Sequence, residues 1–221
     1  MSVALITGAT RGIGKAIALR FLQEKHDVIG FDIEEKTIDH VNYVHHIIDV
    51  SSPSDFIDNI YPDIIVNNAG VQDSGKDIDI NLKGVINITE KYAFDNPNIK
   101  AVTIIGSASG HTGSEFYEYA ASKGGLLAYT KNVANRLAPK AICNSIDPGG
   151  VITELNKPVM DDEKLFAKIM ELTPLKRWAT CEEIADWVYF VSVINKFMTV
   201  QNLLIDGGEA GYNQFIWPED L

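Results

Sequence analysis

The chain has 221 residues, of which 46% are hydrophobic and 22% are charged, and its formal net charge is −11. This length suits one α/β domain, and the balance of residue types excludes an intrinsically disordered chain. Contacts with phosphate backbones need a basic surface, so the acidic excess argues against nucleic acid as a partner.

Neither a secretion signal nor a membrane span is expected. The apolar run Val3–Ile6 is too short for the core of a signal peptide, and no basic residue precedes it. No stretch approaches the roughly 18 apolar residues of a spanning helix. The cysteines Cys143 and Cys181 lack metal-binding or redox spacing. We therefore expect a cytoplasmic protein with no metal site and no membrane partner.

Short apolar runs alternate with longer helical patterns along the chain. Strands are predicted at 3–6, 28–31, 43–47, 64–66, 102–105, 142–146 and 203–205. Helices are predicted near 13–25, 53–59, 77–95, 115–138, 160–171 and 181–194. This alternation predicts parallel strands joined by crossovers, and the uninterrupted apolar runs predict helices on both sheet faces. The expected fold is one doubly wound parallel sheet, a single Rossmann domain of about seven strands over residues 1–221.

The first predicted strand leads directly into a glycine-rich turn, Gly8–Gly14, and a helical pattern follows. Glycines here allow a sharp turn, and the N-terminus of the helix presents N–H groups to a pyrophosphate. The position of this turn between a strand and a helix predicts a dinucleotide site. The loop residues expected to contact the cofactor are Gly8, Thr10, Arg11, Gly12, Ile13 and Gly14.

The second predicted strand ends near Asp32, 18 residues after Gly14. A carboxylate at this place accepts hydrogen bonds from the adenosine ribose and repels a 2′-phosphate, which favours NAD over NADP. Arg11 acts in the opposite direction because a basic loop residue could pair with that phosphate. NAD is therefore the expected cofactor, with NADP left open.

Further motifs follow in order: Asn67-Asn68-Ala69-Gly70 closes the fourth strand, Ser107 ends the fifth, and Tyr119–Lys123 has the pattern YxxxK. With the glycine loop, these motifs resemble the short-chain dehydrogenase/reductase family in its compact, single-domain form. The resemblance covers nearly the whole chain. It implies an NAD(P)-dependent oxidoreductase that interconverts a secondary alcohol and a ketone, and a homodimer or homotetramer.

The resemblance also implies roles for individual residues. Tyr119 would be the general acid/base, Lys123 its cationic partner, Ser107 the group that orients the substrate, and Asn81 the anchor of a proton-relay water. Asn81 has an alternative reading, as a polar helix residue satisfied by backbone groups. The implied cofactor contacts beyond the glycine loop and Asp32 are Asp49, Val50, Asn67, Ala69, Gly70, Tyr119, Lys123, Pro148, Gly149, Val151 and Thr153.

The tyrosine and lysine of the YxxxK pattern suit proton transfer. A tyrosine is a poor base at neutral pH because its ordinary pKa is about 10. A lysine four residues later lies on the same helix face, and its charge favours the phenolate. Tyr117 is a rival phenol, but position 121 is Ala121 rather than a lysine. Tyr119 is therefore the expected acid/base.

Two features depart from the family pattern. Ten residues separate Gly70 from Asn81, where the family places a longer segment, which predicts an open pocket or one completed by another subunit. Asp147 stands before Pro148, where small or apolar residues are usual, and is interpreted as an acceptor of turn hydrogen bonds rather than a functional group.

The substrate itself is not indicated by the sequence. By position alone, the candidates for the substrate pocket are Gln72, His111, Phe116, Asn156, Met160 and Trp178. The aromatic tail at 215–218 is expected to pack on its own domain or on a neighbouring subunit. Two other functions stay open: a non-catalytic dinucleotide sensor with this fold, and a lyase or epimerase that uses the cofactor transiently.

Overall fold

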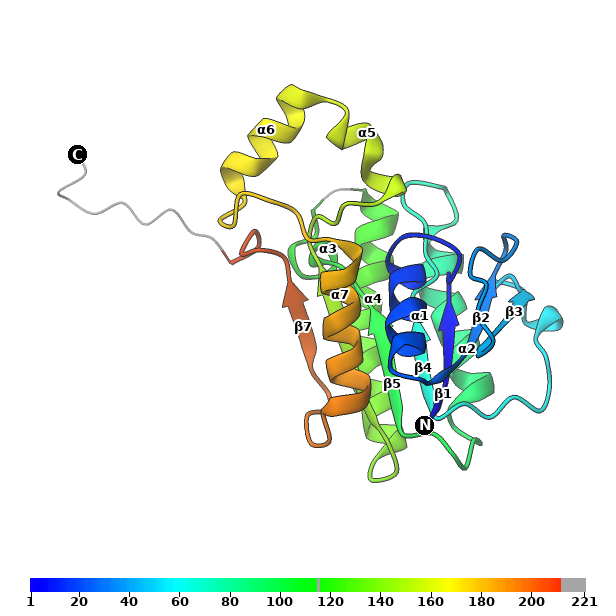
Figure 1. Ribbon diagram of the computed structural model, residues 1–221. Helices are drawn as coiled ribbons and strands as arrows, with labels where there is room; N and C mark the ends of the chain where they lie inside the picture. Colours follow the sequence, from blue (N-terminus) through cyan, green and yellow to red (C-terminus); the bar gives the residue numbers. More distant parts are fainter. Residues whose placement is uncertain (115, 212–221) are drawn as a thin grey trace.

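A computed structural model of the chain describes residues 1–114 and 116–211. Its strands are β1 (Val3–Thr7), β2 (Asp27–Asp32), β3 (Tyr43–Ile47), β4 (Ile64–Asn67), β5 (Ala101–Ile105), β6 (Ile142–Pro148) and β7 (Asn202–Ile205). In this described part they form one parallel, seven-stranded sheet in the order β3-β2-β1-β4-β5-β6-β7 (Figure 1). The predicted doubly wound sheet is confirmed, and each predicted strand is present.

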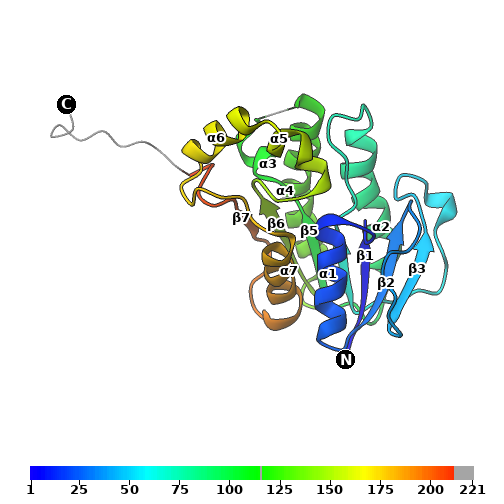
Figure 2. The same ribbon diagram turned by 45° about the horizontal axis from the view of Figure 1, so that its top comes forward.

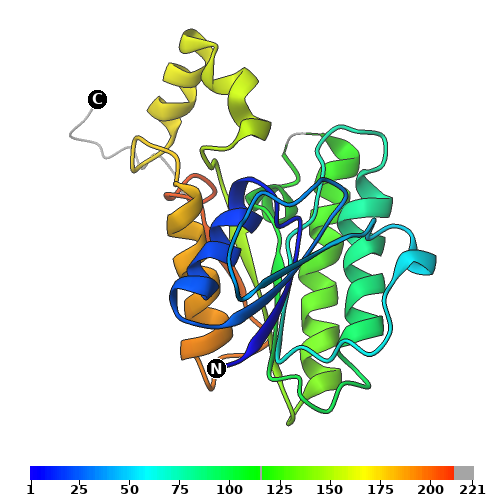
Figure 3. The same cartoon turned by 45° about the vertical axis from the view of Figure 1, so that its right-hand side comes forward.

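Helices cover both faces of the sheet. They are α1 (Gly12–Gln23), α2 (Val85–Tyr92), α3 (Ala108–Thr112), α4 (Tyr117–Leu137), α5 (Lys157–Met160), α6 (Glu163–Leu172) and α7 (Cys181–Tyr189). Short irregular helices add η1 (Pro53–Asp55), η2 (Ile78–Gly84), η3 (Glu154–Asn156) and η4 (Phe190–Ile194). Helices α1 and α7 lie on one face, and α2 and α4 lie on the other (Figure 3).

The strands are apolar on both sides because each side contributes to a separate core layer. Ala4 and Ile6 of β1 belong to the layer that contains Ile17 of α1, whereas Leu5 belongs to the layer that contains Ile88 of α2. All five side chains are fully buried. Burial on both faces explains why the strands read as uninterrupted apolar runs rather than as alternating ones.

The strand order places a crevice at one end of the sheet. The chain builds outward from β1 to β3 and then crosses back to β4, so β1 and β4 are neighbours whose connections leave in opposite directions. Such a switch point leaves an opening at the carboxyl ends of the strands. Helices α5 and α6 rise at this end, on the far side from the N-terminus (Figure 2).

The two ends of the segment between β6 and α7 are hydrogen-bonded to each other. Val151 and Ala179 form an isolated parallel bridge, in which the Ile152 N–H donates to the Ala179 carbonyl at 2.9 Å and the Ala179 N–H donates to the Gly150 carbonyl at 3.0 Å. The chain from 152 to 178, with α5 and α6, therefore leaves and returns at one point beside the crevice.

The helix predicted at 53–59 is wrong. Within this described segment, Pro53–Asp55 form one turn of 3-10 helix and Asn59 adopts a left-handed conformation with φ of 62°. The Ile57 carbonyl accepts a hydrogen bond from the Tyr92 hydroxyl at 3.0 Å. The segment thus packs its apolar side chains on the core layer of α2, and its Ile57 carbonyl bonds to Tyr92 of α2 instead of to an N–H group of a helix of its own.

Other predicted helices are divided. Residues 77–95 form the π-helix η2 followed by α2, residues 160–171 fall in α5 and α6, and residues 181–194 form α7 followed by the π-helix η4. Helix α3 was not predicted, since it has five residues and no apolar periodicity. The start of α7 carries a capping box, in which Thr180 and Glu183 satisfy each other's N–H groups at 2.9 and 3.2 Å.

Candidate active site

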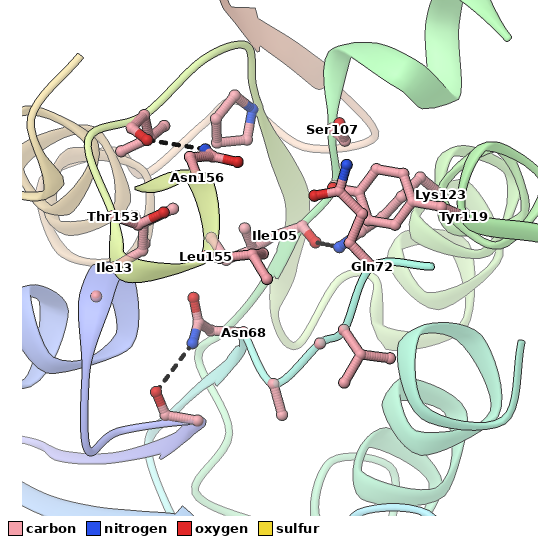
Figure 4. A pocket seen from close by; sticks show the side chains of 18 of the residues that line it. Ile13, Asn68, Gln72, Ile105, Ser107, Tyr119, Lys123, Thr153, Leu155 and Asn156 are labelled. Atoms are coloured by element: carbon pink, nitrogen blue, oxygen red, sulfur yellow. Dashed lines mark hydrogen bonds between the residues drawn. The ribbon is translucent and has the colours of Figure 1, made fainter. Parts of the chain in front are cut away.

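A cavity of about 650 Å³ occupies the crevice at the carboxyl ends of the strands. Ser107, Tyr119 and Lys123 lie along one side of it, and Ile13 and Thr153 lie along the opposite side (Figure 4). Most of the site residues predicted from the sequence line this cavity: Gly8, Arg11, Gly12, Ile13, Asp32, Asp49, Val50, Ala69, Gly70, Ser107, Tyr119, Lys123, Pro148, Gly149, Val151 and Thr153.

The glycine loop requires its glycines because of close backbone approaches. Gly8 has a φ of +68°, and an added Cβ would lie 2.8 Å from the side-chain Nδ2 of Asn68. At Gly14 an added Cβ would lie 2.0 Å from the carbonyl oxygen of Gly8. Arg11, the N-cap of α1, makes no capping hydrogen bond through its side chain, and Gly12 and Ile13 of the first turn line the cavity, where N–H groups of a helix N-terminus can bind an anion. This cradle fits the pyrophosphate of a dinucleotide.

Two predicted residues of the glycine loop, Thr10 and Gly14, do not line the cavity. Thr10 instead positions Asp32. The Asp32 Oδ2 accepts hydrogen bonds from the Thr10 N–H at 3.0 Å and from the Thr10 hydroxyl at 2.8 Å. Its Oδ1 accepts a bond from the Glu34 N–H at 3.1 Å. These contacts fix the carboxylate at the end of β2, where it lines the cavity. The loop and the acidic residue after β2 are therefore one hydrogen-bonded unit.

Of the neighbouring asparagines after β4, the structure places Asn68 on the cavity wall and Asn67 away from it. Asn67 is 1% exposed and donates through Nδ2 to the Thr89 hydroxyl at 2.9 Å. Asn68 donates to the carbonyls of Thr7 and Gly8 at 3.0 and 3.1 Å, which ties β4 to the glycine loop. Alternation along the strand turns consecutive side chains to opposite sides, so one of the pair faces α2.

Lys123 lies one helical turn after Tyr119 on α4, and its Nζ is 5.7 Å from the centroid of the tyrosine ring. The same Nζ donates a hydrogen bond to the Ile105 carbonyl at 3.0 Å. Lys123 is 5% exposed. Burial lowers the pKa of its ammonium to about 8, while the charges of Asp147 and Asp77 act in the opposite direction. A buried cation therefore lies beside the phenol.

Ser107 follows β5 and caps α3, with its Oγ accepting a hydrogen bond from the Ser109 N–H at 3.2 Å. Helix α3 approaches α4 closely at Gly110, where an added Cβ would lie 2.8 Å from the backbone carbonyl of Lys123. This contact holds α3, which follows β5, against α4, the helix that carries Tyr119. As a result, the Ser107 hydroxyl and the Lys123 ammonium open onto the same cavity.

Asn81 sits in the π-helix η2, is fully buried and does not line the cavity. Its Oδ1 accepts from the Val71 N–H at 2.8 Å, and its Nδ2 donates to the Val71 carbonyl at 2.9 Å and to the Ser122 hydroxyl at 3.1 Å. Ser122 in turn donates to the Tyr119 carbonyl at 2.7 Å. The side chain thus ties the loop after β4 to α4, which agrees with the alternative reading of a backbone-satisfied residue.

The interpretation of Asp147 as a turn acceptor is corrected by the structure. Its Oδ2 pairs with the His111 Nε2 at 2.6 Å, across from β6 to α3. The carboxylate is fully buried, whereas 27% of the His111 side chain is exposed. Sequence separation hid the pair, because the two residues meet only through the pairing of β5 with β6 and the short turn into α3.

The substrate end of the cavity is only partly as expected. Gln72, Asn156 and Trp178 line it. His111 is engaged with Asp147, Phe116 lines a separate small cavity, and Met160 lies on neither wall. Glu209 lines the main cavity but was not predicted, and it accepts a hydrogen bond from the Thr173 hydroxyl at 2.6 Å. It follows the turn Asp206-Gly207-Gly208 at the end of β7, and this position at a strand end was the available signal.

Three other expectations concern features outside this cavity. The aromatic tail at 215–218 lies outside the described residues. Among the described residues, no helix is both long and apolar enough to cross a membrane. The same part of the chain holds no cluster of three or more His, Cys, Asp or Glu side chains that could bind a metal ion.

Comparison with known proteins assigns the family. The enoyl-(acyl carrier protein) reductase family model matches residues 61–210. The 3-oxoacyl-(acyl-carrier-protein) reductase of Thermotoga maritima is 32% identical to this chain over 93% of the chain and 96% of the relative. The chain belongs to the short-chain dehydrogenase/reductase family. It is an NAD(P)-dependent oxidoreductase of that family, with the fold and the kind of cofactor that the sequence predicted.

Solved structures of short-chain dehydrogenases/reductases share the whole fold. The ligand-free aldohexose dehydrogenase of Thermoplasma acidophilum aligns with a TM-score of 0.85 at 26% identity, over 98% of this chain and 96% of that one. A 4-hydroxyisoleucine dehydrogenase complexed with NADH gives 0.88 at 27% identity, over 96% and 100%. A putative 2-deoxy-D-gluconate 3-dehydrogenase of Agrobacterium tumefaciens with bound NADP gives 0.87 at 28% identity, over 95% and 96%.

Proposed function

We propose that this enzyme oxidises a secondary alcohol to a ketone, reversibly, with Tyr119 as the general acid/base and NAD as the preferred cofactor. The observation that carries the proposal is that Ser107, Tyr119 and Lys123 line the same cavity as residues of the glycine loop at Gly8–Gly14. A reacting carbon held in this cavity would therefore have a cofactor cradle on one side and a proton-handling group on the other.

The nicotinamide cofactor, when bound, accepts the hydride during oxidation and returns it during reduction. Ser107 Oγ binds the substrate oxygen and directs it toward the phenol of Tyr119. During oxidation Tyr119 Oη takes the hydroxyl proton as the carbon loses its hydride and the C=O bond forms. During reduction the same oxygen gives the proton back.

Lys123 supports this proton transfer in two ways. Its charge, 5.7 Å from the ring centroid, favours the phenolate form of Tyr119. Its ammonium has three donors, of which one is used by the Ile105 carbonyl, so two remain for the hydroxyls of the nicotinamide ribose. Asn81 contributes indirectly, because its hydrogen bonds hold Val71 and Ser122 around this centre.

Asp32 supports NAD as the preferred cofactor. Its carboxylate is fixed by Thr10 and Glu34 at the cavity wall, where a 2′-phosphate would be brought against a negative charge. Arg11 lines the same wall and is the group that would favour NADP. The test is the ratio of kcat/KM for the two cofactors, and a higher value with NADP(H) would overturn the preference.

The substrate is proposed to be a small polar alcohol or its ketone. Gln72, Asn156 and Glu209 supply hydrogen-bonding groups to the cavity lining. The names of the relatives cover a carrier-bound acyl group, an aldohexose and an amino acid, so they favour no single compound. A panel of sugars, polyols, hydroxy acids and simple ketones, followed at the reduced-nicotinamide absorbance, identifies the class.

We also propose that one domain carries both the cofactor site and the catalytic residues, and that the enzyme is a cytoplasmic homodimer or homotetramer. Trp187 of α7 and Phe190 of η4 are 44% and 41% exposed, and their rings meet edge to face at 6.1 Å, so they form an apolar surface pair that a second subunit would cover. Light scattering of the full chain and of a chain truncated after Gly211 measures the assembly and the contribution of the tail.

The decisive experiment compares Tyr119→Phe with Tyr117→Phe. Tyr119→Phe removes the proton-transferring oxygen, so turnover falls by about 100- to 10,000-fold while calorimetry still detects NAD binding. Tyr117 is two residues away and 82% exposed, and its substitution leaves turnover unchanged. Substantial residual activity of Tyr119→Phe contradicts the assignment. Product formed without net cofactor change indicates an epimerase, and NAD binding without turnover on any substrate indicates a sensor.

A further inference from the structure

The proposed reaction makes no use of the ion pair between His111 and Asp147. The pair lies at the carboxyl end of β6, with Asp147 directly before the cavity residue Pro148. Its N–O distance is 2.6 Å. Burying a carboxylate in this way is costly unless the charge is compensated, so a fully buried aspartate beside an active site calls for a function.

The surroundings of Asp147 are arranged to admit its charge. Gly106, between Ile105 and Ser107, leaves room for the carboxylate: an added Cβ would lie 2.0 Å from Asp147 Oδ1. That oxygen makes no hydrogen bond with the described part of the chain. The carboxylate therefore abuts the backbone that holds Ser107 on one side and, through the Ile105 carbonyl, Lys123 on the other.

The charges of two carboxylates, Asp147 and Asp77, raise the pKa of the Lys123 ammonium, and the two carboxylates have different hydrogen-bond partners. Asp77, ahead of η2, accepts hydrogen bonds from the N–H groups of Asp73 and Ser74 at 3.0 and 2.8 Å and from the Ser74 hydroxyl at 3.0 Å. Asp147 pairs with His111 at 2.6 Å, and the Ser145 side chain also lowers the pKa of its carboxyl. Of the two carboxylates, Asp147 has the larger effect on the pKa of the Lys123 ammonium.

Charge and burial act against each other at both groups. Burial raises the pKa of the Asp147 carboxyl, while His111, Ser145 and Lys123 lower it. Burial lowers the pKa of the Lys123 ammonium, while Asp147 and Asp77 raise it. Each buried charge therefore depends on the other, and His111 is the member of the set that reaches solvent. Tyr119 is the remaining titratable group that faces the lysine, from its own helix.

We propose that His111 and Asp147 are a positioning pair for Lys123, in which the hydrogen bond between them keeps a negative charge beside the lysine so that it stays an ammonium when it binds the cofactor ribose. This inference rests on the proposed role of Lys123 in cofactor binding. His111 holds the carboxylate ionised, the carboxylate holds the lysine charged, and the lysine acts on the cofactor and on Tyr119. The two residues themselves contact neither.

The test measures the affinity for NAD as a function of pH by calorimetry, without substrate. In the unaltered enzyme, affinity declines as the pH rises and Lys123 loses its proton. Asp147→Asn keeps the shape of the side chain but removes the charge, so this decline moves down by about one pH unit, as expected for one charge in a medium of dielectric about 20. His111→Leu moves it in the same direction by a smaller amount, and His111→Gln, which keeps an N–H donor, restores part of the shift.

The double variant separates this role from a structural one. If His111 acts through the charge of Asp147, then His111→Leu has no further effect in the Asp147→Asn background. His40→Leu, at an exposed histidine on the loop before β3, is the matched control and leaves the profile unchanged. Thermal melts confirm that each variant is folded, and His111→Leu stands in for Asp147→Asn if the latter fails to fold.

Additive shifts in the double variant, or profiles equal to that of the unaltered enzyme, overturn the pairing proposal. Failure of the proposed function has a different signature, since it appears in the turnover assay with the substrate panel and leaves the pH profile of cofactor binding untouched.

Discussion

Replacing Lys123 by methionine should stabilise the cofactor-free protein while removing its activity. The side chains have similar length, and methionine needs no solvation at a site that is 5% exposed. In the folded chain burial lowers the pKa of Lys123 from 10.5 to about 8, in spite of Asp147 and Asp77. The folded state therefore disfavours the ammonium relative to the unfolded state.

The size of the effect follows from this difference. A separation of about 2.5 pH units between the folded and unfolded states corresponds to about 3 kcal/mol. Loss of the hydrogen bond to the Ile105 carbonyl destabilises the variant by about 1 kcal/mol. The expected net gain at neutral pH is about 2 kcal/mol, or a rise in Tm of about 4–8 °C for a chain of this size.

The stability difference between the methionine variant and the unaltered chain depends on pH. Below about pH 8 the lysine is charged in both states and the full cost is present. As the pH rises toward 10.5, the folded chain has already lost this proton and the unfolded chain follows, so the cost disappears. The advantage of the methionine variant should therefore shrink to near zero at about pH 10.

Urea unfolding of the two proteins at neutral pH and at about pH 10 measures both quantities. Lys131→Met, an exposed position on the same helix, is the control and should change stability by less than about 0.5 kcal/mol. The reasoning is refuted if Lys123→Met is no more stable than the unaltered chain at neutral pH, or if its advantage is the same at both pH values.

Two further outcomes test the cofactor site and its support. Asp32→Ser removes the charge that opposes a 2′-phosphate, so the ratio of kcat/KM for NADP over NAD should rise at least about tenfold, and an unchanged ratio argues against Asp32 as the selector. Gly106→Ala places a Cβ 2.0 Å from Asp147 Oδ1 and should destabilise the fold by about 1–3 kcal/mol. Adding Asp147→Ala to Gly106→Ala removes that oxygen and should recover most of the loss, whereas no recovery in urea unfolding would show that the strain lies elsewhere.

The sequence predicted the sheet well because burial on both faces leaves an unmistakable pattern. Runs such as Ile64–Val66 contain no polar residue, and their order with the helices determines the parallel topology. The residues at the strand ends were predicted for a similar reason. Gly8, Asp32 and Ser107 each lie within two residues of the end of such a run, and parallel strands bring their carboxyl ends to one edge.

The failures came from contacts between distant segments. The predicted helix at 53–59 gave way to packing on α2, which local periodicity does not report. Asn67 and Asn68 are adjacent and alike, and only the strand's alternation decides which one faces the cavity. Asp147 read as a turn residue because its partner His111 is 36 positions away. A buried ion pair of this kind leaves no mark on spacing or composition.

The bridge between Val151 and Ala179 divides the molecule into parts that can change separately. Tyr119, Lys123, Ser107 and the glycine loop lie outside the segment between them. The segment contributes these residues to the cavity: Thr153, Glu154, Leu155, Asn156, Val159, Ile169 and Trp178. Because its two ends are hydrogen-bonded to each other, the segment is a natural unit for grafting. Chimeras that exchange it between homologues should therefore shift substrate choice through the position of Asn156, while Gln72, Glu209 and the catalytic residues stay those of the host.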